Sequence, residues 1–260
     1  MSSNFKLTFF DSPIIHLDKT ESTNDYLKAN PVDKPTLVFA DFQTKGRGQR
    51  GKFWESNSEE NILVSVSIPI HFPAKSVSFI PFNLSIALYF FFENLFETHG
   101  LDEKVNIKWP NDVILHDKKI MGILIESVIS GEKASHIIIG LGFNVLQTKF
   151  SGDNPRAASL ASFFPEIDWK REIVLEKLIH TLETFANHLL LYPKEFIFFN
   201  ENKAMFYNKI LYKLNKPISI KDEGLFINQG VDLQGNLILK NSETQEILLL
   251  NSTSGIEWDY

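Results

Sequence analysis

Short apolar runs separated by turn-forming residues dominate the first part of the chain and predict strands. They cover residues 5–10, 14–17, 36–41 and 62–68. The uncharged stretch 77–92 differs, because its apolar residues recur at helical spacing and predict a buried helix that ends near Gly100. This stretch is shorter than the roughly 18 residues of a membrane-spanning helix, and it contains Pro81 and Asn83, so we expect a core helix.

The middle of the chain continues with strands at residues 105–108, 113–115, 119–128 and 136–144. Because the last three follow one another through short turns, they predict an antiparallel sheet and not a doubly wound one. Residues 146–165 are polar and rich in small residues, which is typical of a mobile surface loop. Apolar positions from Val174 to Leu189 predict a helix of about four turns, and a shorter helix is expected over residues 196–207.

The pattern changes near Lys216-Pro217, where short strands replace helices. We expect strands at 218–220, 225–227, 237–239 and 247–250, with turns at 228–230 and 234–236. We therefore divide the chain into a main domain, residues 1–214, and a small β domain, residues 215–260. About 45 residues give too small a core for independent stability, so the second domain should pack against the first.

Composition narrows the class of protein. The chain has 260 residues, 43% hydrophobic and 22% charged, which is ordinary for a globular protein. The net charge of −6 argues against a general nucleic-acid binder. Cysteine is absent, which excludes disulfides and a thiol nucleophile, and the N-terminus carries no basic and apolar signal segment. We expect a cytoplasmic protein with no membrane partner.

The stretch 45–54, Lys-Gly-Arg-Gly-Gln-Arg-Gly-Lys-Phe-Trp, is the strongest candidate for chemistry. It lies between two predicted strands. Its glycines allow a close backbone approach to a ligand, and Arg47 and Arg50 offer planar cations for phosphate or carboxylate. Alone, such a loop is more often a solvated basic loop. It is also neither a dinucleotide fingerprint, since no helix follows, nor a P-loop, since Phe53 follows Gly51-Lys52.

Other polar groups stand at the ends of predicted elements. Ser22 and Asp25 resemble a capping box that opens a short helix to about Asn30. Gln43 ends a strand just before the glycine loop. Gly122 lies within a strand, where it indicates a bulge or a ligand close to the backbone. Each of these has an ordinary structural explanation when taken alone.

Taken in order, the motifs resemble the biotin–protein ligases, also called biotin–[acetyl-CoA-carboxylase] ligases. The motifs are residues 21–24, 43–51 with Trp54, 108–112, 119–122 and 140–144. The resemblance implies an α+β fold, in which a mixed, mainly antiparallel sheet is flanked by helices as in class II synthetases. It implies, more weakly, that the C-terminal segment is a small SH3-like β-barrel.

The resemblance implies a two-step reaction in which biotin and ATP give biotinyl-5′-AMP, and a lysine of a biotin carboxyl carrier domain then takes the biotin. The expected partners are thus biotin, ATP with Mg²⁺ as co-substrate, and the carrier domain. Beyond this Mg²⁺, which accompanies ATP, no residue of the protein is assigned as a metal ligand. Lys119, Arg47 and Arg50 would be catalytic, because they reduce the repulsion between a carboxylate and an α-phosphate.

The remaining roles are likewise implied by position. Residues expected to contact biotin are Ser22, Thr23, Asn24, Gln43, Arg47, Gly48, Gln49 and Lys119. Residues expected to contact ATP or the adenylate are Arg50, Trp54, Asn111, Asp112, Gly122 and Asn144.

The chain departs from the family pattern in two ways. Only about 20 residues precede the first motif, so we expect a monofunctional ligase that lacks the N-terminal DNA-binding domain and binds no DNA. Gln49 stands where many members have arginine, which leaves adenylate retention open. A lipoate–protein ligase and a non-catalytic binding module remain alternatives, and the oligomeric state is left as monomer or homodimer.

Overall fold

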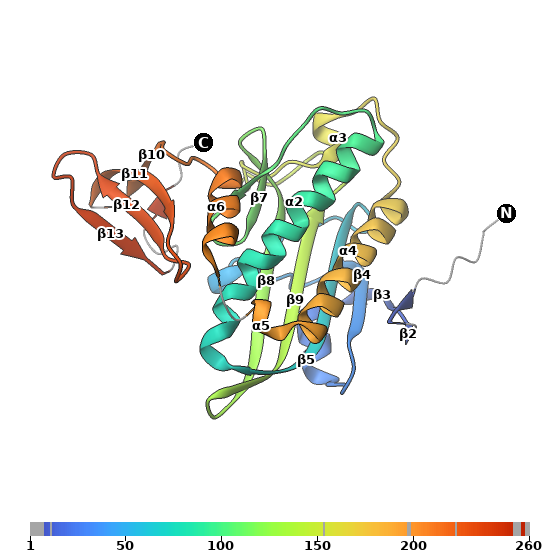
Figure 1. The fold of residues 1–260 in the computed structure, drawn as a ribbon. Helices are drawn as coiled ribbons and strands as arrows, with labels where there is room; N and C mark the ends of the chain where they lie inside the picture. Colours follow the sequence, from blue (N-terminus) through green and yellow to red (C-terminus); the bar gives the residue numbers. More distant parts are fainter. Residues whose placement is uncertain are drawn as a thin grey trace.

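A seven-stranded sheet forms the centre of the protein (Figure 1). The computed structural model describes residues 8–10, 12–152, 154–196, 199–221, 223–251 and 256–257. The sheet order is β3-β4-β5-β9-β8-β7-β6. Its strands are β3 (Ile15–Thr20), β4 (Thr36–Gln43), β5 (Asn61–Pro73), β6 (Asn106–Lys108), β7 (Asp112–Leu115), β8 (Lys118–Ser130) and β9 (Lys133–Asn144).

The strand directions confirm the predicted mixed sheet. β3 pairs with β4 in parallel, and every other neighbouring pair in this sheet is antiparallel. β5 continues to Pro73, beyond the predicted end at residue 68. Its prolines resemble a strand end, but the pairing with β9 resumes at Phe72 after an irregularity that starts at Pro69. The short strands β1 (Thr8–Phe9) and β2 (Ser12–Pro13) pair only with each other, and residues 5–7 of the first predicted strand lie outside the described part.

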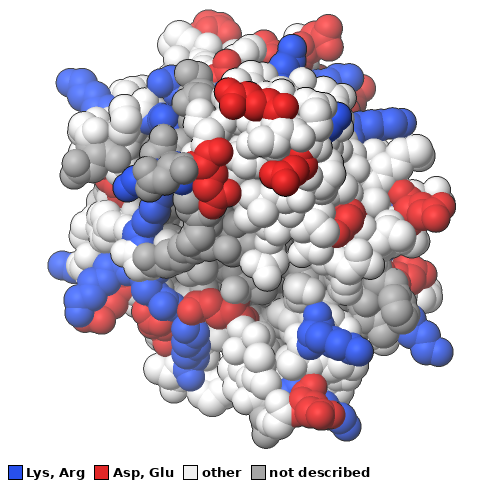
Figure 2. All heavy atoms as spheres, turned by 90° about the vertical axis from the view of Figure 1, so that its left-hand side faces the viewer, with Lys and Arg blue, Asp and Glu red and all other residues white. Residues whose placement is uncertain are grey.

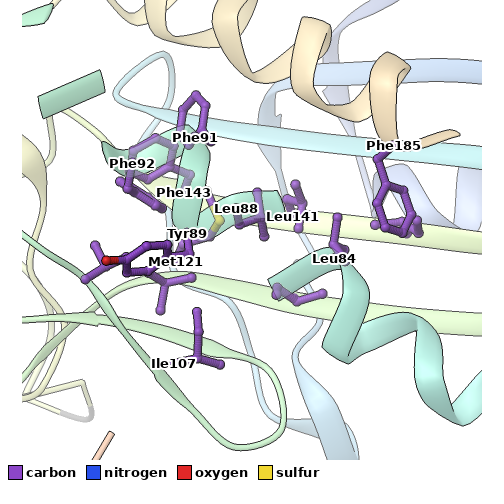
Figure 3. Close-up of a cluster of buried hydrophobic side chains, with 14 of the residues drawn as sticks. Leu84, Leu88, Tyr89, Phe91, Phe92, Ile107, Met121, Leu141, Phe143 and Phe185 are labelled. Atoms are coloured by element: carbon purple, nitrogen blue, oxygen red, sulfur yellow. The ribbon is translucent and has the colours of Figure 1, made fainter. Parts of the chain in front are cut away.

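Helix α2 (Ile80–Thr98) is the predicted core helix, preceded by the 3₁₀ turn η2 (Ala74–Phe79). Together with α4 (Arg171–Leu191), it lies across one face of the sheet (Figure 1). Leu84 and Leu88 are fully buried, and Phe92 meets Phe143 of β9 edge to face (Figure 3). The stretch Ala74–Thr98 is long and apolar enough to cross a membrane, but 61% of its most apolar window is buried inside the protein. It serves as core.

Two helix predictions need correction. α4 extends beyond the predicted 174–189 at both ends. The single helix expected over 196–207 is two helices, α5 (Pro193–Phe196) and α6 (Glu201–Ile210). They are separate because Asn200 caps the second one, with its side chain accepting a hydrogen bond from the Lys203 backbone N–H.

The segment 146–165 is only partly the surface loop expected from its composition. Ser159 caps the short helix α3 (Leu160–Phe163), and Leu160 is fully buried. The backbone of Ala158 donates to the Lys119 carbonyl, and that of Lys119 donates to Arg156. The second half of the segment is therefore fixed against β8, and its polar composition concealed this.

A second, five-stranded antiparallel sheet contains β10 (Pro217–Ile220), β11 (Gly224–Val231), β12 (Leu237–Asn241), β13 (Ile247–Leu250) and β14 (Ile256–Glu257). The turn predicted at 228–230 is wrong, because these residues lie inside β11 at an irregularity in its pairing with β12. The buried Asn228 side chain accepts from the Gly230 backbone there, which produces a local kink without ending the strand.

The small sheet packs beside α6, at the left of Figure 1. Its buried Ile218 and Leu237 belong to the same hydrophobic cluster as the core of the large sheet. The indole of Trp109 donates to the Gly235 carbonyl at 3.1 Å, and Asn208 of α6 contacts Val231. On this side of the molecule, acidic and basic side chains are intermingled (Figure 2).

Candidate active site

A pocket lies over the middle of the large sheet, between helix α1 (Thr23–Ala29) and the glycine loop. Most of its other lining residues come from β8 and β9, with Gln43 of β4 and Asn111 between β6 and β7. The cavity is small, about 50 Å³, enough for a few water molecules. It is lined by Ser22, Thr23, Asn24, Gln43, Arg47, Gly48, Gln49, Trp54, Asn111, Lys119, Gly122, Ile123, Leu124, Gly140, Leu141 and Gly142.

One end of the pocket is a buried network of neutral polar groups. Gln43 Oε1 accepts from the backbone N–H of Thr23 at 2.7 Å and from its hydroxyl at 3.0 Å. Ser65 Oγ lies 2.7 Å from Thr23 Oγ1 and 2.6 Å from Asn24 Oδ1. All four side chains are buried. A buried network of this kind fixes its members in one arrangement and suits a neutral, hydrogen-bonding ligand group.

The local sequence explains why α1 presents these groups. Ser22 takes the extended conformation of an N-cap, and its hydroxyl accepts from the Asp25 backbone N–H. The first turn of the helix then places Thr23 and Asn24 against the sheet. Gln43 stands at the last position of β4, as predicted, and from there its side chain reaches Thr23.

Glycines form the floor of the pocket. Gly122 of β8 pairs directly with Gly142 of β9, and the ring of Trp54 lies over both. A Cβ on Gly122 would meet the Trp54 ring at 2.8 Å, and a Cβ on Gly140 would collide with Asn24. Only glycine allows these close approaches. The sequence predicted a bulge or a ligand at Gly122, and the group that lies against it in this structure is the Trp54 ring. Because Trp54 occupies this floor, a ligand larger than a few waters requires it to move.

The other end of the pocket is cationic. Lys119 Nζ lies 2.7 Å from Asp112 Oδ1, and Lys108 Nζ lies 2.9 Å from Asp112 Oδ2. Burial alone would raise the pKa of Asp112, but the two lysines outweigh it and lower that pKa below its usual 3.8. Lys119 therefore brings a cation to this end of the pocket, and Asp112 holds it there. Lys119 also faces the Trp54 ring, 5.2 Å from its centroid.

Arg47 lines the pocket but does not point a free guanidinium toward it. Its Nη2 lies 2.7 Å from Asp25 and 2.8 Å from Glu126, so two carboxylates balance its charge together with that of Lys28. Its Nε is buried without a hydrogen-bond partner among the described residues. Arg47 is therefore held in place by acids, an arrangement that sequence reasoning did not foresee.

The structure brings eleven of the predicted residues to the pocket lining, and of the other predicted residues whose side chains are described, Asp112 and Asn144 lie outside it. Asp112 does not line the pocket, but it forms an ion pair with Lys119, which does. Asn144 donates to the Ala158 carbonyl at 3.0 Å, while its Oδ1 is buried and has no partner among the residues described. The backbone of Arg50 lies in the 3₁₀ turn η1 (Gln49–Gly51), but its side chain lies outside the described part of the structure.

Sequence reasoning missed several residues of the site. Ser65 and Glu126 are polar residues within largely apolar strand runs, and that interruption was the available signal. Gly140 was noted only as part of a motif. Leu124 and Leu141 line the pocket, and nothing in their local sequence distinguishes them from core residues.

One group of described residues has the spacing of metal ligands, namely His16, Asp18 and Asp41 on β3 and β4. Asp41 already accepts from Arg171 at 2.7 Å and lies 2.7 Å from the His16 ring. The group is separate from the pocket lining. We assign it no role in the site.

Comparisons with known proteins agree with this geometry. The sequence pattern of the Biotin/lipoate A/B protein ligase family matches residues 15–144. The bifunctional ligase/repressor BirA of Escherichia coli is 28% identical over 229 residues, which are 85% of this chain and 67% of that protein. The biotin–[acetyl-CoA-carboxylase] ligase of Paracoccus denitrificans is 34% identical over 131 residues, 50% of this chain and 53% of that one.

A solved structure shares the fold. Biotin protein ligase from Aquifex aeolicus, in complex with biotin and ATP, superposes with a TM-score of 0.72 at 24% sequence identity. The superposition covers 94% of this chain and 97% of the Aquifex aeolicus chain. The large sheet with its flanking helices is thus the fold of biotin protein ligases.

Proposed function

The chain belongs to the Biotin/lipoate A/B protein ligase family, and on this premise we propose that it is an ATP-dependent biotin–protein ligase. It activates biotin as biotinyl-5′-AMP and transfers the biotin to a specific lysine of a biotin carboxyl carrier domain. Relatives named as biotin–[acetyl-CoA-carboxylase] ligases support this choice within the family.

The observation that carries the proposal is the difference in charge between the two ends of the pocket. The end at Thr23, Asn24 and Gln43 is neutral and polar, and the end at Lys119 is positive. The glycines that mark the two ends, Gly140 and Gly142, are two positions apart on β9, about 7 Å along a strand. Biotin has a neutral ureido ring at one end and a carboxylate at the other, which matches this arrangement.

In the first step, a carboxylate oxygen of biotin attacks the α-phosphorus of ATP, the bond to the β-phosphate oxygen breaks, and pyrophosphate leaves. Lys119 is placed to neutralise charge where the two anions meet, and Asp112 holds its ammonium group in position. In the second step, the carrier lysine attacks the acyl carbon as a neutral amine. AMP leaves with the electrons of the C–O bond, and the amine loses a proton.

The other predicted residues fit roles around these atoms. Ser22, Thr23, Asn24 and Gln43 would contact the ureido ring, and Gly48 and Gln49 would lie along the chain of biotin. Trp54, Asn111, Gly122 and Asn144 would face the adenylate. Trp54 would leave its present position on the glycine floor and offer its ring to the adenine.

Mg²⁺ enters this proposal as part of the ATP complex. Both carboxylate oxygens of Asp112 already accept from lysines. We therefore assign no protein-held ion and derive no step through one. The ion supplies charge neutralisation on the phosphates it accompanies.

Lipoate is the rival substrate within the family. Its dithiolane ring lacks the hydrogen-bonding groups of a ureido ring, so it would leave the buried amides and hydroxyls at the polar end without partners. Such loss of partners discriminates strongly between ligands. ATP–pyrophosphate exchange with biotin and then with lipoate tests the assignment. Exchange with lipoate alone would move it to a lipoate ligase, and exchange with neither would favour a non-catalytic binding module.

We further propose that residues 1–214 and 215–260 are the two domains of the protein. The small sheet would then support the main domain through the shared hydrophobic cluster. A cytoplasmic location is proposed on the absence of cysteine and the use of ATP.

A further inference from the structure

Glu126 joins two separate parts of the site through a single carboxylate. It stands on β8 and accepts from Asn24 Nδ2 at 2.8 Å, from Lys28 Nζ at 2.6 Å and from Arg47 Nη2 at 2.8 Å. Asn24 and Lys28 belong to α1, whereas Arg47 belongs to the glycine loop. The loop and the helix thus meet at one side chain of the central sheet.

Glu126 is outside the pocket lining, but two of its three partners are part of it. Asn24 belongs to the neutral polar end, and its Oδ1 is already fixed by Ser65. The bond to Glu126 fixes the amide nitrogen as well, so the orientation of the whole side chain is determined. Arg47 has its Nη2 turned to Glu126 and Asp25, which leaves the buried Nε as a donor for a ligand.

The charges of this group also balance. Asp25 and Glu126 oppose Lys28 and Arg47, so Arg47 brings no net charge to the polar end. Burial alone would raise the pKa of Glu126, but bonds from Lys28 and Asn24 and the charge of Arg47 lower it below its usual 4.5. The carboxylate is ionised at neutral pH.

We propose that Glu126 is a positioning residue for the ligase reaction. It holds Asn24 and the glycine loop in the arrangement that receives the neutral head of the substrate, and it does so without touching the substrate. This inference rests on the proposed function for the identity of that substrate. The contact by which Glu126 holds the glycine loop is present in the free protein. It can therefore be tested without measuring enzyme activity.

The first test is limited trypsin digestion of the free protein. The loop offers cleavage sites at Lys45, Arg47, Arg50 and Lys52. Glu126→Gln removes the charge but keeps the size, and it should raise the rate of cleavage in the loop about fivefold, corresponding to about 1 kcal/mol. The matched control is Glu132→Gln, at the exposed turn between β8 and β9, which should cleave like the parent. Equal cleavage of Glu126→Gln and the control would overturn the proposal.

The second test separates positioning from general destabilisation. Glu126→Gln should raise the KM for biotin in pyrophosphate exchange about tenfold, about 1.4 kcal/mol, with kcat changed by less than about twofold. Glu126→Asp keeps the charge and should recover part of the loss. An unchanged KM, or a kcat that falls as much as KM rises, would contradict the proposal.

A double variant shows whether the effect passes through Arg47. In an Arg47→Ala background, Glu126→Gln should have a smaller effect on the KM for biotin than in the parent, because only the contacts with Asn24 and Lys28 are left to lose. Additive effects would mean that Glu126 does not act through Arg47.

Two outcomes distinguish this inference from the proposed function. If the parent shows no exchange with biotin, the proposed substrate is wrong, while the trypsin result still decides the role of Glu126. If Glu126→Gln does not fold, the Asp25→Asn variant is used for the trypsin test. This substitution removes the ion pair between Arg47 and Asp25 on the exposed surface of α1. That variant should also raise loop cleavage, and a parental rate would count against anchoring of the loop by carboxylates.

Discussion

Trp109 and Gly235 are 126 positions apart in the sequence, yet the Trp109 indole donates a 3.1 Å hydrogen bond to the Gly235 carbonyl. Trp109 is buried, and it begins the turn that contains Asn111 and leads to Asp112 at the start of β7. Gly235 belongs to a turn of the small sheet, between β11 and β12. The bond therefore connects the small sheet to the residues behind Lys119.

Trp109→Phe should destabilise the protein, because it leaves a buried carbonyl without its donor. The expected loss in the free energy of unfolding is about 1–3 kcal/mol, measured by urea denaturation. Tyr192→Phe, on an exposed side chain at the end of α4, is the control and should change little. A parental stability for Trp109→Phe would show that this bond contributes nothing measurable.

Lys119→Ala should retain the fold and lose adenylation. Since Lys119 acts where charge accumulates in the transition state, kcat should fall by about 10²–10³ while the KM for biotin changes far less. The neighbouring Lys118→Ala is the matched control, because Lys118 donates to the Pro155 carbonyl and not into the pocket. Initial rates of pyrophosphate exchange give both constants, and a near-normal kcat would remove Lys119 from the mechanism.

Two glycine substitutions should affect different substrates. A Cβ at position 140 collides with Asn24, and a Cβ at 142 collides with the Trp54 ring. Gly140→Ala should therefore raise the KM for biotin about tenfold, and Gly142→Ala should raise the KM for ATP about tenfold. Each estimate assumes that the added methyl group costs about 1–3 kcal/mol of strain. Gly152→Ala is the control, since nothing lies within 4 Å of its added carbon. The same pattern of KM changes in both variants would refute separate ends of the pocket.

Gln49→Arg should slow release of the adenylate. Gln49 lines the pocket, and an arginine there could form a charge-assisted hydrogen bond worth about 1 kcal/mol more than that of an amide. This difference corresponds to a residence about fivefold longer, with biotin affinity nearly unchanged. Stopped-flow release of preformed biotinyl-adenylate compares the two proteins, and identical off-rates would mean that residue 49 does not contact the intermediate.

Acid should remove the stabilisation that Asp112 and Glu126 contribute to the folded protein. Asp112 and Glu126 both have a pKa lowered in the folded protein by neighbouring cations and hydrogen bonds. Their stabilising effect is complete above the pKa values of the unfolded chain, about 4, and is lost as the pH falls through the lower folded values. Urea midpoints between about pH 6 and pH 3 should therefore decline less steeply for Glu126→Gln than for Glu132→Gln. Parallel declines would show that Glu126 adds no acid sensitivity.

The order of strands and helices could be predicted because it depends on local periodicity. The α2 phenylalanines follow helical spacing, and β8 and β9 each contain a largely apolar run of strand length. Errors arose where local signals have two meanings. The Asn228–Gly230 segment has the composition of a turn, yet it forms an irregularity inside a strand. The break before α6 depends on the cap at Asn200, which no apolar pattern marks.

The candidate site could be located, but its internal contacts could not be predicted. The motifs predicted that Arg47 and Lys119 lie in one pocket, and both line it. That Arg47 pairs with Glu126, 79 positions away, depends on the register of β8 relative to the glycine loop. A glutamate in a strand run is ordinarily interpreted as a solvent-facing residue, so the sequence held no reason to pair them.

The facing glycines Gly122 and Gly142 have a consequence for the exchange of backbone hydrogens with solvent. Elsewhere along β8 and β9, opposed side chains cover the ladder, but at this pair the ring of Trp54 covers it instead. When a ligand displaces Trp54, it must take over that covering role. Amide protons of β8 and β9 around this pair should therefore exchange slowly both in the free protein and with the adenylate bound, and fastest in a Trp54→Ala variant without ligand. In this protein, the centre of the sheet is shielded by whichever ring lies on its glycine floor.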